Sequence, residues 1–384
     1  MKSTKITFIV FLLLFISGIG CAQSVPSLEL ESAAAILMDY DSGQILFSKN
    51  EKDPRVPASL AKVMTLYVAF DQIAAGKADF NDTTQVTEDA WRVGGSQMFL
   101  EPRETVTVEQ LLLGITVVSG NDACVALAQA LAGTEALYVQ WMNEKAHALG
   151  LNLHFTDVHG LGDSNRVTAE DLAYLVRSYL KDHPQALRFH QQPSFAYQPR
   201  SAQVPIEQPN RNGLLRSFEG ADGLKTGHLE AAGYNLIGTA VRNNRRLISV
   251  VLGARSESQR EKETISLLNY GFKNFDLIDI SRFLEDKTAV VYKGKEHEVG
   301  LFLEEPFLTI PKGIQEGVSI SFQTNYVEAP IQKGDEVGVL SVLLNDRPLK
   351  ESPLLAVKSI ERGGFIRIIW DSVVLFLRDL IKRR

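Results

Sequence analysis

The sequence predicts an α/β (α+β) domain, with a sheet flanked by a helical cluster, then a small all-β domain and a C-terminal amphipathic helix. Strand signals lie at both ends of segment 28–278 with helical patterns between them, so the two ends are expected to build one sheet. From 280 to 360, short β-rich segments alternate with Gly, Pro and Asn turns. From 364 to 384, apolar side chains recur on one side of a helix. A chain of 384 residues is long enough for two domains.

The composition excludes several classes of function. A hydrophobic share of 45% and a charged share of 22% are typical of a globular protein. The formal charge of −6 argues against a nucleic-acid partner. The 7 His and 2 Cys residues form no metal-ligand pattern, so the sequence predicts no metal and no cofactor.

Residues 1–22 have the pattern of a secretory signal peptide. Lys2 and Lys5 precede an apolar run over 6–19, and small residues precede the expected cut after Ala22. The apolar run is short for a transmembrane helix. This end of the chain predicts an exported protein.

An alternative for the same end is a lipoprotein signal with the lipid on Cys21. Gly18 stands where such signals usually carry a larger aliphatic residue, which argues against it. If Cys21 leaves with the signal peptide, only Cys124 remains and no internal disulfide forms.

The elements of segment 28–278 follow in chain order. A hairpin joins strands near 33–38 and 44–47 through Asp41-Ser42-Gly43. Helices are expected over 59–75, 107–118, 122–131, 135–149 and 168–180, with Thr107 capping the second. Strands over 223–226, 234–241 and 246–252 and a helix over 256–275 complete the domain.

Segment 280–360 is expected to form the all-β domain, with strands near 288–292, 307–310, 318–322 and 336–343. It holds no cluster of candidate catalytic groups. We therefore interpret it as a spacer or docking module.

The C-terminal helix, 364–384, is predicted to lie on a membrane surface. One sector of the helix carries the charged residues Arg367, Asp371, Arg378 and Lys382. Charges inside the run disfavour a membrane span, whereas the apolar side with Trp370 suits the interface of a bilayer. The alternative is a helix docked on its own domain or in a homodimer.

Ser59 and Lys62 are the first pair of candidate catalytic residues. Residues three apart on a helix lie on one face, so the amine of Lys62 is expected to reach the hydroxyl of Ser59. A serine needs an adjacent base to become a nucleophile, and a lysine serves as that base when burial lowers its pKa. The alternative is that Ser59 only caps the helix.

Two further short strings accompany this pair. Ser119-Gly120-Asn121 falls at a break between helices, where ordinary turn residues are the alternative. Lys225-Thr226-Gly227, followed by His228, falls on a strand, where a solvated edge lysine is the alternative. Each string alone is weak evidence, but the three occur in order on the elements that catalysis requires.

The ordered trio resembles the signature of penicillin-binding proteins and class A β-lactamases. Over residues 30–275 the chain is similar to the D-alanyl-D-alanine carboxypeptidases, which are low-molecular-mass penicillin-binding proteins. The strings that carry the similarity are Asp39-Tyr40-Asp41-Ser42-Gly43, Pro57–Thr65, Ser96–Leu100, Ser119–Ala128, His159-Gly160-Leu161, Asn210–Leu215 and Asp222–Gly233. The resemblance implies a penicillin-binding/β-lactamase-like catalytic domain, a peptidoglycan stem peptide as substrate, and β-lactam antibiotics as covalent inhibitors.

The resemblance also implies roles for the catalytic residues. Ser59 would attack the carbonyl of the penultimate D-alanine while Lys62 accepts its proton. Ser119 would relay a proton to the departing amine, and Asn121 would hold the substrate amide and the lysine. The backbone N–H groups of Ser59 and His228 would stabilise the oxyanion.

Four residues are expected to bind the substrate carboxylate or to keep the site electropositive. Lys225 would lower the pKa of Lys62 by its charge, and Thr226 would donate to the carboxylate. Arg211 and Arg255 are further candidates for the same carboxylate. Leu229 departs from the family, which often has a hydroxyl residue at that position.

Two other functions compete with the carboxypeptidase. A serine β-lactamase needs a general base for water, and Glu170 lies in the appropriate interval. Because Glu170 follows Thr168 at a helix start, we interpret it as a first-turn acid instead. A non-catalytic scaffold that binds wall peptides would not need a paired serine and lysine. The combined features predict an exported enzyme on the periplasmic face of the cytoplasmic membrane.

Overall fold

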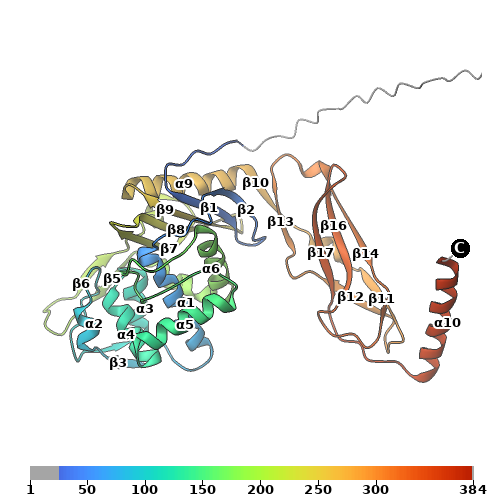
Figure 1. Ribbon diagram of the computed structural model, residues 1–384, viewed down its shortest axis with the longest axis horizontal. Coiled ribbons are helices and arrows are strands. Elements are labelled where there is room, and N and C mark those ends of the chain that lie inside the picture. The colour runs from blue at the N-terminus through green and yellow to red at the C-terminus, as the bar shows by residue number, and fades with distance from the viewer. Residues whose placement is uncertain (1–25, 383–384) are drawn as a thin grey trace, which may run out of the picture.

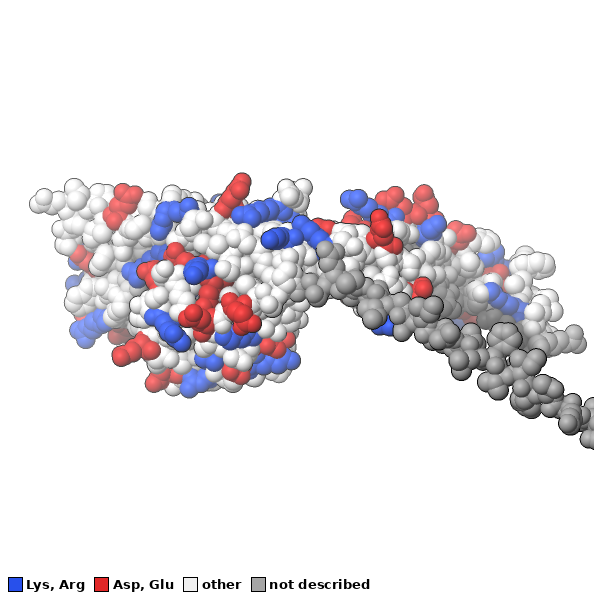
Figure 2. Space-filling model, turned by 90° about the horizontal axis from the view of Figure 1, so that it is seen from above, with Lys and Arg blue, Asp and Glu red and all other residues white. Residues whose placement is uncertain are grey.

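The computed structural model describes residues 26–382. Figure 1 shows an N-terminal domain of mixed helix and sheet, an elongated domain of β-strands beside it, and helix α10 (Phe365–Lys382) at the far end of the β domain. This arrangement confirms the predicted fold class of an α/β domain followed by an all-β domain. Figure 2 shows acidic and basic side chains interspersed over the visible face of both domains.

The N-terminal domain is built on a five-stranded antiparallel sheet in the order β2-β1-β9-β8-β7. Its strands are β1 (Ala34–Asp39), β2 (Ile45–Lys49), β7 (Ala221–Leu229), β8 (Gly233–Arg242) and β9 (Arg245–Ala254). The first and last parts of the domain meet where β1 pairs with β9. The predicted sheet from both ends of the domain is therefore confirmed, and β7 forms one edge.

Successive side chains of β1 point to opposite faces of this sheet, as strand geometry requires. Ile36 and Met38 join the large core under the helical cluster, whereas Ala35 and Leu37 join a smaller core on the other face. Each of these side chains is fully buried, and burying one large apolar side chain contributes about 1.5–3 kcal/mol. Because both faces are covered, β1 is a continuous apolar run.

Helices cover the two faces of the sheet. The longer ones are α1 (Lys62–Ala74), α3 (Val108–Thr116), α4 (Asn121–Ala132), α5 (Glu135–Ala148), α6 (Ala169–Asp182) and α9 (Glu257–Asn274). Helix α6 packs on β1 and β9 with the cluster, and α9 packs on β8 and β9 from the other side. Thr107 caps α3 in a capping box with Gln110, as the sequence predicts.

Several short elements were not among the sequence predictions. They are α2 (Glu88–Arg92), α7 (Leu187–His190), α8 (Leu214–Ser217), and the two-stranded sheets β3 (Thr83–Gln85) with β4 (Thr105–Thr107) and β5 (Ser194–Tyr197) with β6 (Ile206–Pro209). Each is five residues or fewer, too short to produce a periodic pattern.

The β domain begins after β10 (Phe275–Asp279), which pairs with β13 (Phe307–Pro311). Its six-stranded sheet has the order β14-β16-β17-β12-β11-β15. The strands are β11 (Thr288–Tyr292), β12 (Glu298–Phe302), β14 (Val318–Thr324), β15 (Val327–Glu328), β16 (Glu336–Leu344) and β17 (Arg347–Ala356). The four predicted strands are present, and β12, β15 and β17 are additional.

The two domains contact each other through polar groups. Arg177 on α6 pairs with Glu305 at 2.8 Å, and Gln44 exchanges two hydrogen bonds with the backbone of Thr309. The Thr309 hydroxyl also lies 2.6 Å from the hydroxyl of Ser42. The β1–β2 turn and α6 therefore hold the start of the β domain.

Helix α10 turns its charged side toward the β domain. Asp371 is buried, accepts a hydrogen bond from the backbone N–H of Lys293, and pairs with Arg367 at 2.9 Å. The opposite side carries Ile366 and Trp370, which are 84% and 67% exposed. Within 26–382, none of the helices combines the length and apolar content that crossing a bilayer requires.

Candidate active site

Ser59 lies in a 3₁₀ turn (Ala58–Ala61) that leads directly into α1. Its Oγ atom lies 2.8 Å from the Nζ atom of Lys62, three residues on. The N-cap positions of the turn and of α1 are Pro57 and Ala61, and neither provides a side-chain cap. The capping alternative for Ser59 is therefore wrong, and the predicted helix over 59–75 begins as a 3₁₀ turn.

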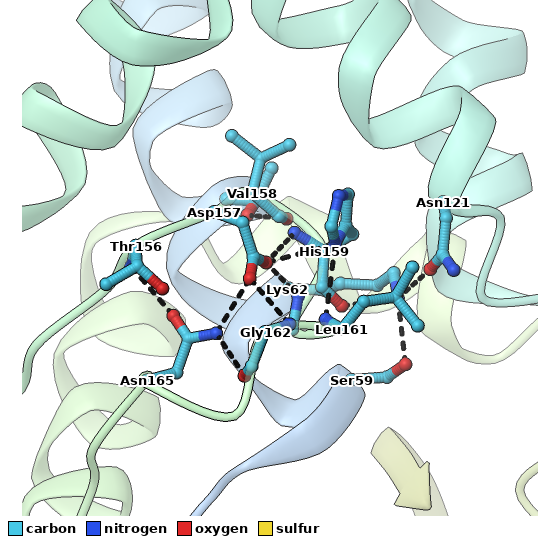
Figure 3. Close-up of polar contacts among 12 residues, drawn as sticks. Ser59, Lys62, Asn121, Thr156, Asp157, Val158, His159, Leu161, Gly162 and Asn165 are labelled. Carbon is cyan, nitrogen blue, oxygen red and sulfur yellow. Dashed lines mark hydrogen bonds and ion pairs between the residues drawn. The ribbon is translucent and has the colours of Figure 1, made fainter. Parts of the chain in front are cut away.

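Lys62 is fully buried and its Nζ atom has three polar neighbours. The Oδ1 atom of Asn121 lies at 2.7 Å, the backbone carbonyl of His159 at 2.8 Å, and the Ser59 hydroxyl completes the set (Figure 3). Asn121 Oδ1 and the carbonyl can only accept hydrogen bonds, whereas the hydroxyl can also donate. A neutral amine would give its two N–H bonds to the acceptors and turn its lone pair toward Ser59.

The surroundings of Lys62 make that neutral form more accessible than it is for an ordinary lysine. Burial is the largest effect and, with the nearby Arg211 guanidinium, lowers the pKa of Lys62 to about 8 although Asp157 and Asp122 oppose the shift. The buried Lys225 amine also has its pKa lowered, first by burial and then by repulsion from Lys62. About a tenth of the Lys62 amine is therefore uncharged at pH 7, far more than for an ordinary lysine.

Ser119 and Lys225 form the second half of the site. Lys225 Nζ lies 2.9 Å from Ser119 Oγ and 3.0 Å from the carbonyl of Thr226. Ser119 has a φ of 62°, which is unfavourable for a non-glycine residue. Such strain is found at functional sites where the surrounding structure imposes it. Asn121 follows as the first residue of α4 and reaches Lys62.

The edge strand β7 lies directly against the serine. A Cβ atom on Gly227 would lie 3.0 Å from the carbonyl oxygen of Pro57 and 3.1 Å from the backbone nitrogen of Ser59. Only glycine allows this approach without displacement. The amide of Asn235 on β8 donates to the carbonyls of Val56 and Pro57, which fixes the chain that enters the 3₁₀ turn.

A cavity of about 510 Å³ opens above these residues. Of the predicted site residues, it is lined by Ser59, Ser119, Thr226, His228 and Arg211. Lys62, Asn121 and Lys225 lie buried beneath its wall. Arg255 is not brought to this cavity: its side chain is 81% exposed and pairs with Glu31 at 3.7 Å.

Other residues of the cavity were not among the predicted site residues. Arg216, Tyr234, Glu257 and Arg260 line it, and Tyr234 stacks on His228 with ring centroids 4.0 Å apart. Arg260 lies in the first turns of α9, one turn beyond Arg255, and its side chain is 4% exposed. A cationic residue on an amphipathic helix is an ordinary surface feature in a sequence, so no signal distinguished Arg260.

Glu170 lies away from the cavity. It is in the first turn of α6, whose N-cap is Thr168, and lies 3.8 Å from the amine of Lys52. The interpretation of Glu170 as a first-turn acid is confirmed. Within the described residues, no group of three or more His, Cys, Asp or Glu side chains is placed to hold a metal ion.

The fold and the three converging strings are those of the penicillin-binding class of serine enzymes. The chain belongs to the D-alanyl-D-alanine carboxypeptidase family, whose model matches residues 21–256. A second model, the C-terminal domain of penicillin-binding protein 5, matches residues 279–362.

Individual relatives cover nearly the whole chain. D-alanyl-D-alanine carboxypeptidase DacC of Escherichia coli is 37% identical over 95% of this chain and 93% of its own length. DacA of Haemophilus influenzae is 35% identical over 99% of both chains. The crystal structure of penicillin binding protein 5 from Haemophilus influenzae superposes with a TM-score of 0.79 at 34% identity, covering 88% of this chain and 100% of that chain.

Proposed function

We propose that this D-Ala-D-Ala carboxypeptidase works through an acyl-enzyme on Ser59. The Ser59 oxygen attacks the carbonyl carbon of the penultimate D-alanine of a stem pentapeptide, and its proton passes to neutral Lys62. The amide C–N bond then breaks, a proton reaches the leaving nitrogen through Ser119, and D-alanine departs. Water hydrolyses the ester, which releases the shortened peptide and restores Ser59.

The observation that carries this proposal is the set of partners around the Lys62 amine. Two neighbours accept hydrogen bonds only, and the third is the Ser59 hydroxyl at 2.8 Å. This is the geometry that a general base needs before it removes the proton of a nucleophile.

Different groups of the site would bind the oxyanion and the carboxylate of the substrate. The N–H groups of Ser59 and His228 would stabilise the oxyanion, which the close approach of β7 at Gly227 supports. Thr226 and Arg211 line the cavity and would bind the carboxylate of the terminal D-alanine. Because Arg255 is paired with Glu31 outside the cavity, we leave it out of the proposed site.

The test combines covalent labelling with product release. Purified wild-type protein is expected to bind a fluorescent penicillin covalently and to release D-alanine from a stem pentapeptide. Ser59→Ala is expected to lose both signals while keeping the wild-type melting temperature, because this half-buried hydroxyl lines the cavity and contributes little to packing. Labelling that persists in Ser59→Ala would place the nucleophile elsewhere.

The same experiment separates the competing functions. A β-lactamase would release hydrolysed penicillin rapidly, whereas a carboxypeptidase stays acylated for longer. A scaffold would give neither labelling nor D-alanine. Glu170 lies beside Lys52 and does not line the cavity, so its carboxylate is not placed to activate a water molecule there. This position supports the carboxypeptidase over the β-lactamase.

We also propose how the protein is placed in the cell. Residues 1–22, which include Cys21 and lie outside the described residues, would be the signal peptide; 28–278 would be the catalytic domain and 280–360 a spacer. Residues 364–384 would hold the enzyme on the periplasmic face of the cytoplasmic membrane, since the apolar side of α10 is exposed. A homodimer formed through the same apolar side is the competing arrangement.

A further inference from the structure

The loop over 156–165 is folded around one carboxylate, as Figure 3 shows. Asp157 Oδ1 accepts hydrogen bonds from the backbone N–H groups of His159, at 3.0 Å, and Gly160. Its Oδ2 atom accepts from the backbone N–H of Gly162 at 2.8 Å and from the side-chain amide of Asn165 at 2.9 Å. A single side chain, 13% exposed, therefore accepts from four donors and also lies 3.0 Å from the Nδ1 atom of His159, and it determines the path of the loop.

This loop contacts both members of the proposed catalytic pair. The carbonyl of His159 accepts from Lys62 Nζ at 2.8 Å, and it can do so because the adjacent N–H groups are turned toward Asp157. A Cβ atom on Gly160 would lie 1.9 Å from the carbonyl oxygen of Ala58, so the loop also abuts the backbone beside Ser59. Asp157 itself does not line the cavity.

We infer that Asp157 is a positioning residue: its carboxylate folds the loop so that the His159 carbonyl holds the Lys62 amine with its lone pair toward Ser59. The inference rests on the proposed role of Lys62 as general base. Asp157 acts through the loop and has no contact with substrate. Misplacing a catalytic group by about 1 Å costs on the order of a hundredfold in rate, so a loop that sets this position matters for catalysis.

The charge of Asp157 has a second effect, which makes the inference testable. The charged and titratable groups that act on the pKa of Lys62 are Cys124, Asp157, Arg211 and Asp122, and Lys62 in turn lowers the pKa of the neighbouring Lys225. Burial tends to raise the pKa of Asp157, but its hydrogen bonds with His159, Asn165 and Gly160 and the charge of His159 together lower it, so the carboxylate is ionised at neutral pH. This negative charge raises the pKa of Lys62, so removing it lowers that pKa further.

The substitution Asp157→Asn removes the charge and places an amide N–H₂ against the donors of Gly162 and Asn165. We expect the plateau rate of acylation by a fluorescent penicillin to fall about tenfold to a hundredfold. We also expect the acid limb of the rate against pH to move about one unit toward lower pH. Asp163→Asn, which removes the same charge from an exposed position of the same loop, should change neither quantity.

A purely structural role would lower the melting temperature of Asp157→Asn without moving the acid limb. An unchanged plateau and limb in a folded Asp157→Asn protein would overturn the inference. If that variant does not fold, Asn165→Ala is the second test, because it loosens the loop but keeps the carboxylate. In Asn165→Ala the plateau rate of acylation should fall, and the acid limb should stay at the wild-type pH. An unchanged plateau in Asn165→Ala would then overturn it. Absence of labelling in the wild type would instead overturn the proposed function.

Discussion

The Nζ atom of Lys225 lies 2.9 Å from the Oγ atom of Ser119, although the two residues are 106 positions apart in the chain. The strained backbone of Ser119 is held by the two residues that follow it, since Gly120 N–H donates to the carbonyl of Gly114 and Asn121 N–H donates to that of Ser96. The hydroxyl is thereby fixed between the buried lysine and the cavity.

Ser119→Ala should remove the route by which a proton reaches the leaving nitrogen. We expect the rate of acylation by a fluorescent penicillin to fall about a hundredfold, since proton transfer by a positioned group contributes about 10²–10⁴-fold. Stopped-flow or gel-based labelling measures this rate. Ser319→Ala, at an exposed position of the β domain, is the control. A rate within threefold of wild type would exclude Ser119 from the relay.

The pH dependence of acylation should report Lys62. The neutral amine is the active form, and the pKa of Lys62 is lowered to about 8, so the rate should rise about tenfold per pH unit below that value and level off above it. Lys62→Arg should lose the activity over the whole range, because a guanidinium stays protonated. A wild-type rate that is flat between pH 6 and pH 9 would contradict the assignment of Lys62 as base.

Gly227→Ala should separate β7 from the serine. The added methyl group would meet Pro57 O at 3.0 Å and Ser59 N at 3.1 Å, so the strand must shift and the proposed oxyanion donors move apart. We expect acylation to fall about a hundredfold, the effect of losing one oxyanion donor. Gly364→Ala, where a Cβ meets nothing within 4 Å, is the control for the methyl group itself and should acylate normally. Normal acylation by Gly227→Ala would argue against these donors.

Asp39→Asn should destabilise the folded protein rather than impair catalysis directly. Asp39 is fully buried at the end of β1, pairs with Arg245 Nε at 2.7 Å, and accepts from the backbone N–H groups of Asp41 and Ser42. Breaking a buried ion pair costs about 3–5 kcal/mol in the free energy of unfolding. Urea unfolding measures this loss, and Asp41→Asn on the same turn is the control. A loss below about 1 kcal/mol would show that Arg245 finds another partner.

Trp370→Asp should weaken attachment to a membrane. Trp370 is 67% exposed on the apolar side of α10, and a charge there opposes burial in the bilayer interface. We expect sedimentation of the protein with anionic phospholipid vesicles to fall about tenfold. Ser372→Asp adds the same charge about 200° around the helix and should bind like wild type. Failure of the wild type to bind vesicles, with a dimer in solution, would favour the homodimer.

Strong local patterns predicted most of the fold. The alternation and turn residues of the hairpin around Asp41-Ser42-Gly43 and the cap at Thr107 depend on residues within a few positions of one another. Such features appear in the sequence because their cause is local. Strands β12 and β17 were missed because their pairing partners, not their own patterns, define them.

The features of the site likewise fall into those that follow from local sequence and those that follow from tertiary contacts. The sequence by itself determined which residue types are present in Ser59-x-x-Lys62, Ser119-x-Asn121 and Lys225-Thr226-Gly227, and the first pair meets because helical spacing brings it together. Only the tertiary structure decided that Arg260 and not Arg255 lines the cavity, and that Asp157 turns the His159 carbonyl toward Lys62. The physical reason is that burial and orientation arise from contacts between distant segments, which no short window of sequence contains.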